Sequence, residues 1–332
     1  DPTSPESVSS DGLAQDQRDE LEDAFGDRMR QDEPLARYTS ARIGGPADYL
    51  LPVRSADELA EAAQVLWDHR VDFLVIGGGS NVLVSDRGVR GVVILNQARA
   101  VSFDRPEDGP AVWAESGASF GGLGRRAADR GLSGLEWAST VPGTVGGAVV
   151  NNAGAHGSDV AGCLRVAEIL QHNEGPESWS PDELDYDYRE SWLKKHPGRA
   201  VVLSATFELE ASTPEETKRT MQEFADHRRL TQPTGASWGS MFKNPEDDYA
   251  GRLIEAAGLK GLQVGGAEVS EQHANFFVNR GGATAKDVWQ LLHTVRRRVE
   301  QESGIELELE IQPVGDWEFS DHRGAGEGAL DE

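Results

Sequence analysis

The architecture of this chain follows from one segment, Phe73-Leu74-Val75-Ile76-Gly77-Gly78-Gly79-Ser80-Asn81-Val82-Leu83-Val84. The apolar runs on either side of the glycines predict two buried strands. A strand, a glycine loop and a second strand suit a nest of backbone N–H groups around a pyrophosphate, because glycine allows close approach and positive φ values. A simple tight turn is the alternative for this segment taken alone.

The loop is not of the Rossmann type, because it contains no G-x-G-x-x-G pattern and leads into a strand instead of a helix. A second glycine-rich segment covers residues 140–148. Two such loops predict a clamp on the pyrophosphate and isoalloxazine of FAD, although close packing of a helix on a strand would also explain the second. The residues predicted to bind the cofactor are Gly77, Gly78, Gly79, Ser80, Asn81, Thr140, Pro142, Gly143, Gly146 and Gly147.

The chain is strongly acidic. Its 332 residues predict two or three domains, and its formal net charge is −25. A field of that sign repels nucleic acid and anionic lipid, so neither is expected as a partner. A solvated acidic surface, as in a salt-loving organism, is the simplest explanation. A phosphorylated substrate would need a local basic pocket, for which the chain offers Arg189, Arg228, Arg229, Lys243 and Arg252.

Cysteine content and hydropathy limit which disulfides, metal sites and membrane segments the chain can form. Cys163 is the single cysteine, which excludes an internal disulfide and a cysteine-based metal cluster, and no metal site is predicted. No apolar run is long enough to span a bilayer, and the N-terminus lacks a basic region followed by a hydrophobic one. We therefore expect a cytoplasmic protein with no membrane partner. We also expect a monomer, although the sequence does not determine the oligomeric state.

The element pattern divides the chain near residue 211. Ser55 with Glu58 forms a capping box ahead of one helix, and a long helix is predicted between Thr284 and Gly304. Strands are predicted at 73–76, 82–84, 92–95, 111–115, 165–170 and 200–209, and further helices at 119–130, 213–228 and 248–257. The predicted domains are an acidic flexible tail at 1–30, FAD-binding subdomains at 31–105 and 106–211, a substrate-binding domain at 212–318 and a second acidic flexible tail at 319–332.

Three places carry reactive groups. Arg189, after Tyr188, suits a carboxylate because a guanidinium pairs bidentately. Residues 239–245 place a hydroxyl, an ammonium and an amide in one turn. Glutamates at 306, 308 and 310 alternate in an apolar run, which predicts a strand with all three on one face. Taken singly, such a strand is usually a solvated edge, and such an arginine is usually part of a surface salt bridge.

Taken in order, these segments resemble the UDP-N-acetylenolpyruvoylglucosamine reductase family. The similarity runs from about Leu35 to Gly315, and the chain resembles the shorter subgroup because no long insertion follows Arg189. Each motif is weak by itself, but so many in the right order are specific. The matching motifs are Tyr38-Thr39-Ser40-Ala41-Arg42-Ile43-Gly44-Gly45-Pro46-Ala47-Asp48, residues 76–84, residues 141–157, Tyr188-Arg189-Glu190-Ser191, Gln232-Pro233, residues 239–245 and Val269-Ser270-Glu271-Gln272-His273-Ala274-Asn275-Phe276.

The resemblance implies a fold and a reaction. The fold would be α+β, with a two-subdomain FAD-binding unit of the vanillyl-alcohol oxidase type and a C-terminal α+β substrate-binding domain. The reaction would be reduction of UDP-N-acetylglucosamine enolpyruvate to UDP-N-acetylmuramate for peptidoglycan, with NADPH as electron donor. NADH as the donor is left open by the sequence.

The resemblance also assigns roles to residues. Ser240 would protonate C2 of the enolpyruvyl group, while Arg189 and Glu310 would stabilise the enolate. Tyr188 and Asn244 would bind substrate, and Lys243 would either assist Ser240 or bind the phosphates. The family usually has Pro-Glu-Val at the last glutamate, whereas this chain has Leu309-Glu310-Ile311. Glu308 therefore stays open as the alternative to Glu310.

Two other functions compete. An FAD-dependent alcohol or sugar oxidase of the same superfamily often attaches its flavin to a histidine in the first glycine loop. Residues 77–81 contain no histidine, so dissociable FAD is predicted. A nucleotide-sugar-binding regulator without chemistry is the third interpretation, and the presence of Ser240, Arg189 and a C-terminal acid argues against it.

Overall fold

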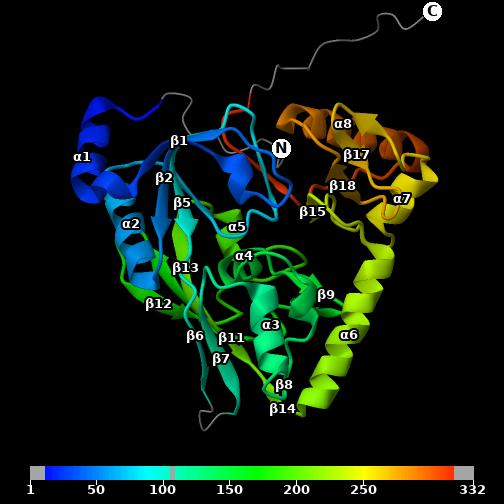
Figure 1. Cartoon of the computed structure of the whole chain (residues 1–332), viewed down its shortest axis with the longest axis horizontal. Helices are drawn as coiled ribbons and strands as arrows, with labels where there is room; N and C mark the ends of the chain where they lie inside the picture. The colour runs from blue at the N-terminus through cyan, green and yellow to red at the C-terminus, as the bar shows by residue number, and fades with distance from the viewer. Residues whose placement is uncertain (1–11, 105–108, 318–332) are drawn as a thin grey trace, which may run out of the picture.

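The computed structural model describes residues 12–104 and 109–317 (Figure 1). The two main sheets of the described residues lie in the N-terminal two thirds of the chain, beside short two-stranded pairs, and a further four-stranded sheet with its helices follows. The first sheet has the strand order β1-β2-β5-β3, with β2, β5 and β3 parallel and β1 antiparallel to β2. Its strands are β1 (Arg30–Pro34), β2 (Pro46–Val53), β3 (Phe73–Ile76) and β5 (Val89–Asn96).

Helix α2 (Ala56–Asp68) covers this sheet. It begins where Ser55 Oγ accepts the backbone N–H of Glu58, as the capping pattern predicted. Leu59 and Leu66, which lie on one helix face, are fully buried in a cluster with Ile94 of β5. Burial of this face therefore fixes the helix on the sheet.

The second sheet is antiparallel throughout, with the order β12-β11-β13-β7-β6. Its strands are β6 (Val101–Asp104), β7 (Ala111–Glu115), β11 (Leu164–Gln171), β12 (Pro176–Trp179) and β13 (Ala200–Glu208). Helices α3 (Phe120–Ala128) and α4 (Val145–Val150) pack on it through a core that contains Phe120 and Phe207. Val201 and Leu203 belong instead to the core of the first sheet, so the two sheets share buried surface.

The C-terminal part begins with α6 (Pro214–Thr231), which runs along the side of the molecule toward a four-stranded sheet of order β15-β18-β17-β16 (Figure 1). Helix α8 (Ala285–Ser303) starts at a capping box between Thr284 and Asp287 and ends at Gly304, whose φ of 71° terminates it. The remaining elements here are β15 (Ser237–Ser240), α7 (Ala250–Ala256), β16 (Gln263–Val264), β17 (Ala267–Val269) and β18 (Phe276–Asn279).

The end of the chain returns to the first glycine loop. Strand β19 (Gln312–Val314) pairs in parallel with β4 (Val82–Val84), and the N–H of Gln312 donates to the carbonyl of Asn81 at 2.9 Å. The red segment of Figure 1 shows this return. Asp86 makes a second connection between the two parts, because its carboxylate accepts the N–H groups of Ala285 and Lys286 at 2.8 and 2.9 Å. Both contacts hold the C-terminal part against the N-terminal part.

No helix among the described residues combines the length and apolarity that crossing a membrane requires.

Short elements complete the fold. The short elements are α1 (Gln15–Phe25), η1 (Gly26–Arg28), η2 (Leu35–Tyr38), β8 (Leu132–Ser133), η3 (Trp137–Thr140), β9 (Gly154–Ala155), β10 (Ser158–Asp159), α5 (Trp192–Lys195) and β14 (Glu210–Ala211).

Within the predicted flexible tail at 1–30 the sequence also allows a loose helix around residues 17–25, and the structure has a helix there. Residues 15–25 form α1, and Leu21 and Phe25, which lie one helical turn apart, are buried against the core of α2. The acidic composition hid this small apolar face. The remainder of the predicted tails, residues 1–11 and 318–332, lies outside the described residues.

We predict that Asp86→Ala lowers the free energy of unfolding by about 1–2 kcal/mol, because two N–H groups at the start of α8 lose their acceptor. Urea unfolding followed by tryptophan fluorescence measures this. Asp72→Ala, which changes an exposed aspartate, is the control. Equal unfolding midpoints for the two variants would contradict the role given to Asp86.

Candidate active site

One cavity, of about 350 Å³, lies where the two glycine loops meet the C-terminal part. Every residue predicted to bind the cofactor lines it, from Gly77 to Asn81 and from Thr140 to Gly147. The predicted catalytic residues Ser240, Arg189 and Glu310 line it as well. The structure therefore brings together groups that lie far apart in the chain.

The glycine loops touch each other. A Cβ on Gly78 would lie 2.9 Å from Cα of Gly143, and a Cβ on Gly77 would lie 2.3 Å from Oγ1 of Thr144. Gly79 has a φ of 57°. Larger residues would separate the loops, so close packing is one reason for the glycines.

Unpaired backbone N–H groups give a second reason for the glycines in the first loop. Among the described residues, the N–H groups of Gly78, Gly79 and Ser80 find no hydrogen-bond acceptor. Adjacent unpaired N–H groups around a left-handed residue form an anion-binding nest. These residues therefore fit the pyrophosphate of a dinucleotide cofactor.

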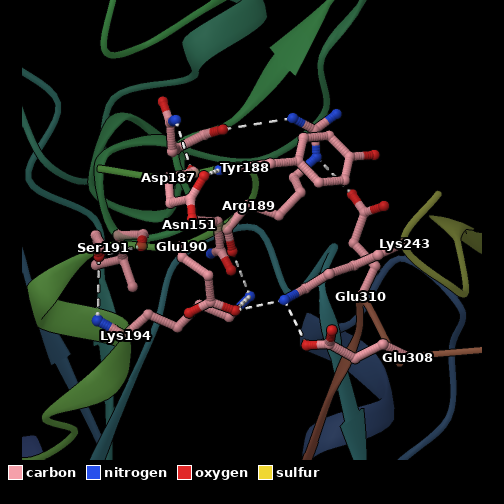
Figure 2. Close-up of polar contacts among 12 residues, drawn as sticks. Asn151, Asp187, Tyr188, Arg189, Glu190, Ser191, Lys194, Lys243, Glu308 and Glu310 are labelled. Atoms are coloured by element: carbon pink, nitrogen blue, oxygen red, sulfur yellow. Dashed lines mark hydrogen bonds and ion pairs between the residues drawn. The ribbon is translucent and has the colours of Figure 1, made fainter. Parts of the chain in front are cut away.

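Arg189 is held at several atoms. Its Nε donates to Glu310 Oε1 at 2.9 Å (Figure 2), and its Nη2 donates to the carbonyl of Gly154 at 2.8 Å. Its guanidinium carbon lies 5.0 Å from the ring centroid of Tyr188. The guanidinium side chain is 20% exposed, so it is nearly enclosed but still reaches the cavity wall.

Glu310 is the enclosed acid. Burial raises the pKa of Glu310 above its ordinary value, while the Arg189 guanidinium opposes the shift. The short contact with Arg189 favours the carboxylate, and the loss of hydration favours the protonated acid. Burial outweighs the ion pair in setting the pKa of Glu310, because the side chain is only 18% exposed. A carboxyl group poised in this way can donate to a negatively charged oxygen.

The segment with the three C-terminal glutamates is not the regular strand that its alternation predicts, because its pairing among the described residues is an isolated bridge between Leu309 and Phe242. The alternation itself is kept, since the apolar residues between the glutamates pack into one core. Glu306 pairs with Arg296 at 2.7 Å, and Glu308 pairs with Lys243 at 2.6 Å. Only Glu310 lines the cavity, which favours it over Glu308 as the candidate acid.

Ser240 is the last residue of β15, in a part of the ladder that is irregular between Ser237 and Ser240. Gly239 has a φ of 90° there. The hydroxyl of Ser240 makes no hydrogen bond to another described residue, and it lines the cavity. It is therefore free to interact with a ligand.

The predicted substrate-binding residues lie elsewhere. Tyr188, Lys243 and Asn244 line a neighbouring hollow of about 480 Å³. Lys243 Nζ lies 2.5 Å from Glu190 Oε1 (Figure 2), and Asn244 Oδ1 accepts the N–H of Ala250. The structure thus does not place Lys243 beside Ser240, because two carboxylates hold its ammonium elsewhere.

Further polar residues line the cavity, among them Asn151, Lys194 and Arg228. Arg228 of α6 has no ion-pair partner among the described residues. Lys194 belongs to α5, five residues after Arg189. Asn151 accepts a hydrogen bond from Asn81 Nδ2, which also donates to the carbonyl of Glu310. Sequence reasoning proposed Arg228 for a basic pocket but missed Lys194 and Asn151, for which proximity to the motifs was the available signal.

No metal-ligating group of three or more histidine, cysteine or acidic residues occurs in the described part of the chain. Cys163 is half-buried, and burial raises the pKa of its thiol to about 12, which makes it a poor nucleophile.

Comparisons with known proteins give the family. An FAD binding domain model matches residues 47–171, and the model of the UDP-N-acetylenolpyruvoylglucosamine reductase C-terminal domain matches residues 231–314. The reductase of that name from Rubrobacter xylanophilus is 47% identical over 287 residues, which cover 86% of this chain and 95% of the relative. The one from Bacillus subtilis is 42% identical over 299 residues, which cover 89% and 97%.

A solved structure agrees. UDP-N-acetylenolpyruvylglucosamine reductase from Thermus caldophilus is 38% identical, with a TM-score of 0.73, and the match covers 86% of this chain and 99% of that chain. The predicted fold class is confirmed: the chain is α+β, with an FAD-binding unit followed by the C-terminal domain of the reductase family. Because relatives at this identity align over nearly their whole length, the chain belongs to the UDP-N-acetylenolpyruvoylglucosamine reductase family and is an FAD-dependent oxidoreductase.

Proposed function

We propose that this protein uses NADPH to reduce UDP-N-acetylglucosamine enolpyruvate to UDP-N-acetylmuramate, a step toward peptidoglycan. The observation that carries the proposal is the convergence of Ser240, Arg189 and Glu310 on the cavity that the glycine loops line. The family name supports the substrate. NADPH and the individual residue roles belong to the proposal.

The proposed chemistry divides between cofactor and protein. When bound, FAD supplies the hydride that reaches C3 of the enolpyruvyl double bond. Ser240 then protonates C2, because its hydroxyl lines the cavity without a competing hydrogen bond within the described residues. A positioned general acid contributes about 10²–10⁴ in rate.

Charge stabilisation falls to Arg189 and Glu310. Negative charge develops on C2 and on the oxygens of the carboxylate next to it, which together form the enolate. A guanidinium can bind those oxygens in a bidentate manner, and a protonated Glu310 can donate to one of them. Their mutual contact at 2.9 Å holds both groups in place before the substrate arrives.

Substrate binding draws on cations in an otherwise acidic protein. Arg228, without an ion-pair partner among the described residues, is proposed to bind a phosphate of the nucleotide. Tyr188, Lys243 and Asn244 are proposed to contact the part of the substrate that extends into the neighbouring hollow. Lys243 would exchange Glu190 or Glu308 for a phosphate there.

The proposal includes the remaining sequence-based expectations. FAD binds without a covalent bond, since residues 77–81 contain no histidine. The subdomain boundaries 31–105, 106–211 and 212–318, a monomeric state and a cytoplasmic location are kept as parts of it.

Ser240→Ala is expected to leave bleaching of the flavin by NADPH nearly unchanged. Reoxidation by the enolpyruvyl substrate should slow by about 10²–10⁴, because only the second half-reaction needs the proton. Anaerobic stopped-flow absorbance measures both steps. Ser237→Ala, on the same strand but outside the cavity, is the control. Equal slowing of both half-reactions in Ser240→Ala would refute the proton-donor role.

Arg189→Lys should also slow reoxidation strongly, because an ammonium cannot reproduce the two parallel hydrogen bonds of a guanidinium. Arg165→Lys is the matched control, since Arg165 pairs with Glu208 away from the cavity. A wild-type reoxidation rate in Arg189→Lys, measured in the same apparatus, would remove Arg189 from the mechanism.

Gly147→Leu tests the cofactor site. The nearest atom to a Cβ there is Thr144 Oγ1 at 3.7 Å, and Gly147 lies within α4, so the FAD-free fold should tolerate the side chain. The side chain would occupy space in the cavity, and we expect FAD content to fall while the unfolding temperature of the FAD-free protein does not. Full FAD content by absorbance would place the flavin elsewhere.

A further inference from the structure

Arg189 sits in an unusual backbone conformation. Residues 187–190 form a tight reversal in which Asp187 and Glu190 exchange backbone hydrogen bonds of 3.2 and 3.1 Å. Arg189 is the third residue of this turn and has a φ of 57°. Type II turns require a positive φ at this place and usually carry glycine or asparagine there. A residue with a Cβ atom costs on the order of 1 kcal/mol in this conformation, so other contacts must stabilise the turn.

Lys194 provides such a contact. Its Nζ donates to the carbonyl oxygen of Arg189 at 2.7 Å, and its side chain is only 11% exposed. Figure 2 shows Lys194 reaching back from α5 toward the turn. Because a carbonyl enclosed in the protein needs a donor, the ammonium stabilises the peptide group that follows Arg189.

The backbone of Lys194 is itself anchored. Ser191 is fully buried, and its Oγ accepts the N–H of Lys194 at 3.1 Å while donating to the carbonyl of Val150 at 2.6 Å. The helix that carries Lys194 is thus tied to the segment after the second glycine loop. Hydrogen bonds therefore hold both the backbone N–H and the side-chain ammonium of Lys194.

The charge on Lys194 is only partly balanced. Glu190 Oε1 lies 3.7 Å from its Nζ, and the same oxygen lies 2.5 Å from Lys243 Nζ. Burial lowers the pKa of Lys194, and Glu190 opposes the shift. An ammonium that shares its carboxylate in this way gains much from the carbonyl of Arg189, which explains the short distance between them.

We propose that Lys194 is a positioning residue for Arg189. By holding the peptide after Arg189, it keeps the turn in the conformation that places the guanidinium beside Glu310 at the cavity. The catalytic consequence rests on the proposed function of Arg189, whereas the effect on the turn does not. Lys194 acts through Arg189 and needs no contact with the substrate.

The test uses Lys194→Met, which keeps the length of the side chain but removes the donor. Lys195→Met is the matched control, because Lys195 lies on the same helix, 44% exposed, and pairs with Asp185 at 2.9 Å. In the FAD-loaded protein, bleaching by NADPH should be unchanged in both variants. Reoxidation by the enolpyruvyl substrate should slow about 10- to 100-fold in Lys194→Met only. Lys194→Arg, which retains a donor, should recover most of the rate.

A second readout does not depend on turnover. Hydrogen–deuterium exchange of the peptide that contains residues 187–190, in the FAD-loaded protein without substrate, should be faster in Lys194→Met than in wild type and Lys195→Met. Unchanged exchange, or an unchanged reoxidation rate, would overturn the inference. Loss of FAD or a much lower unfolding temperature in Lys194→Met would also overturn it, because the lysine would then serve the fold as a whole. If wild-type protein is not reoxidised by this substrate, the proposed function fails, and the exchange result still decides the role of Lys194.

Discussion

The ion pair between Arg189 and Glu310 connects the two parts of the molecule at the point where chemistry is proposed. The two residues are 121 positions apart, and Nε and Oε1 approach to 2.9 Å. Glu310 can reach Arg189 because the strand that follows it, β19, pairs with β4 directly after the first glycine loop. The same pairing that closes the fold therefore completes the cavity.

The electrostatics of the site run against those of the whole chain. A formal net charge of −25 would repel a nucleotide substrate, yet the guanidinium groups of Arg189 and Arg228 line the cavity. Cations in a partly enclosed site attract an anionic ligand over short distances. At such distances salt screens the attraction little, and the distant acidic surface opposes it little. Other basic residues proposed for this pocket are committed elsewhere, since Arg229 pairs with Asp226 and Arg252 with Asp248.

The sequence predicted the features that depend on local chemistry. Capping residues such as Ser55 and Thr284 and the apolar runs around the first glycine loop predicted the elements. The order of the motifs gave the family resemblance, and the resemblance implied the fold class. The ion pairs of Lys243, the irregular path of the glutamate segment and the contact of Lys194 with Arg189 depend on residues that meet only in the folded chain. The burial of α1 was missed because two apolar residues, Leu21 and Phe25, do not stand out in an acidic segment.

We expect one cavity to hold the flavin and to receive the enolpyruvyl group beside Ser240, Arg189 and Glu310. The most direct test is to reduce the purified wild-type holoenzyme anaerobically and mix it with UDP-N-acetylglucosamine enolpyruvate while recording flavin absorbance. We predict rapid return of the oxidised spectrum with formation of UDP-N-acetylmuramate. A flavin that stays reduced with this substrate but is reoxidised by oxygen would contradict it.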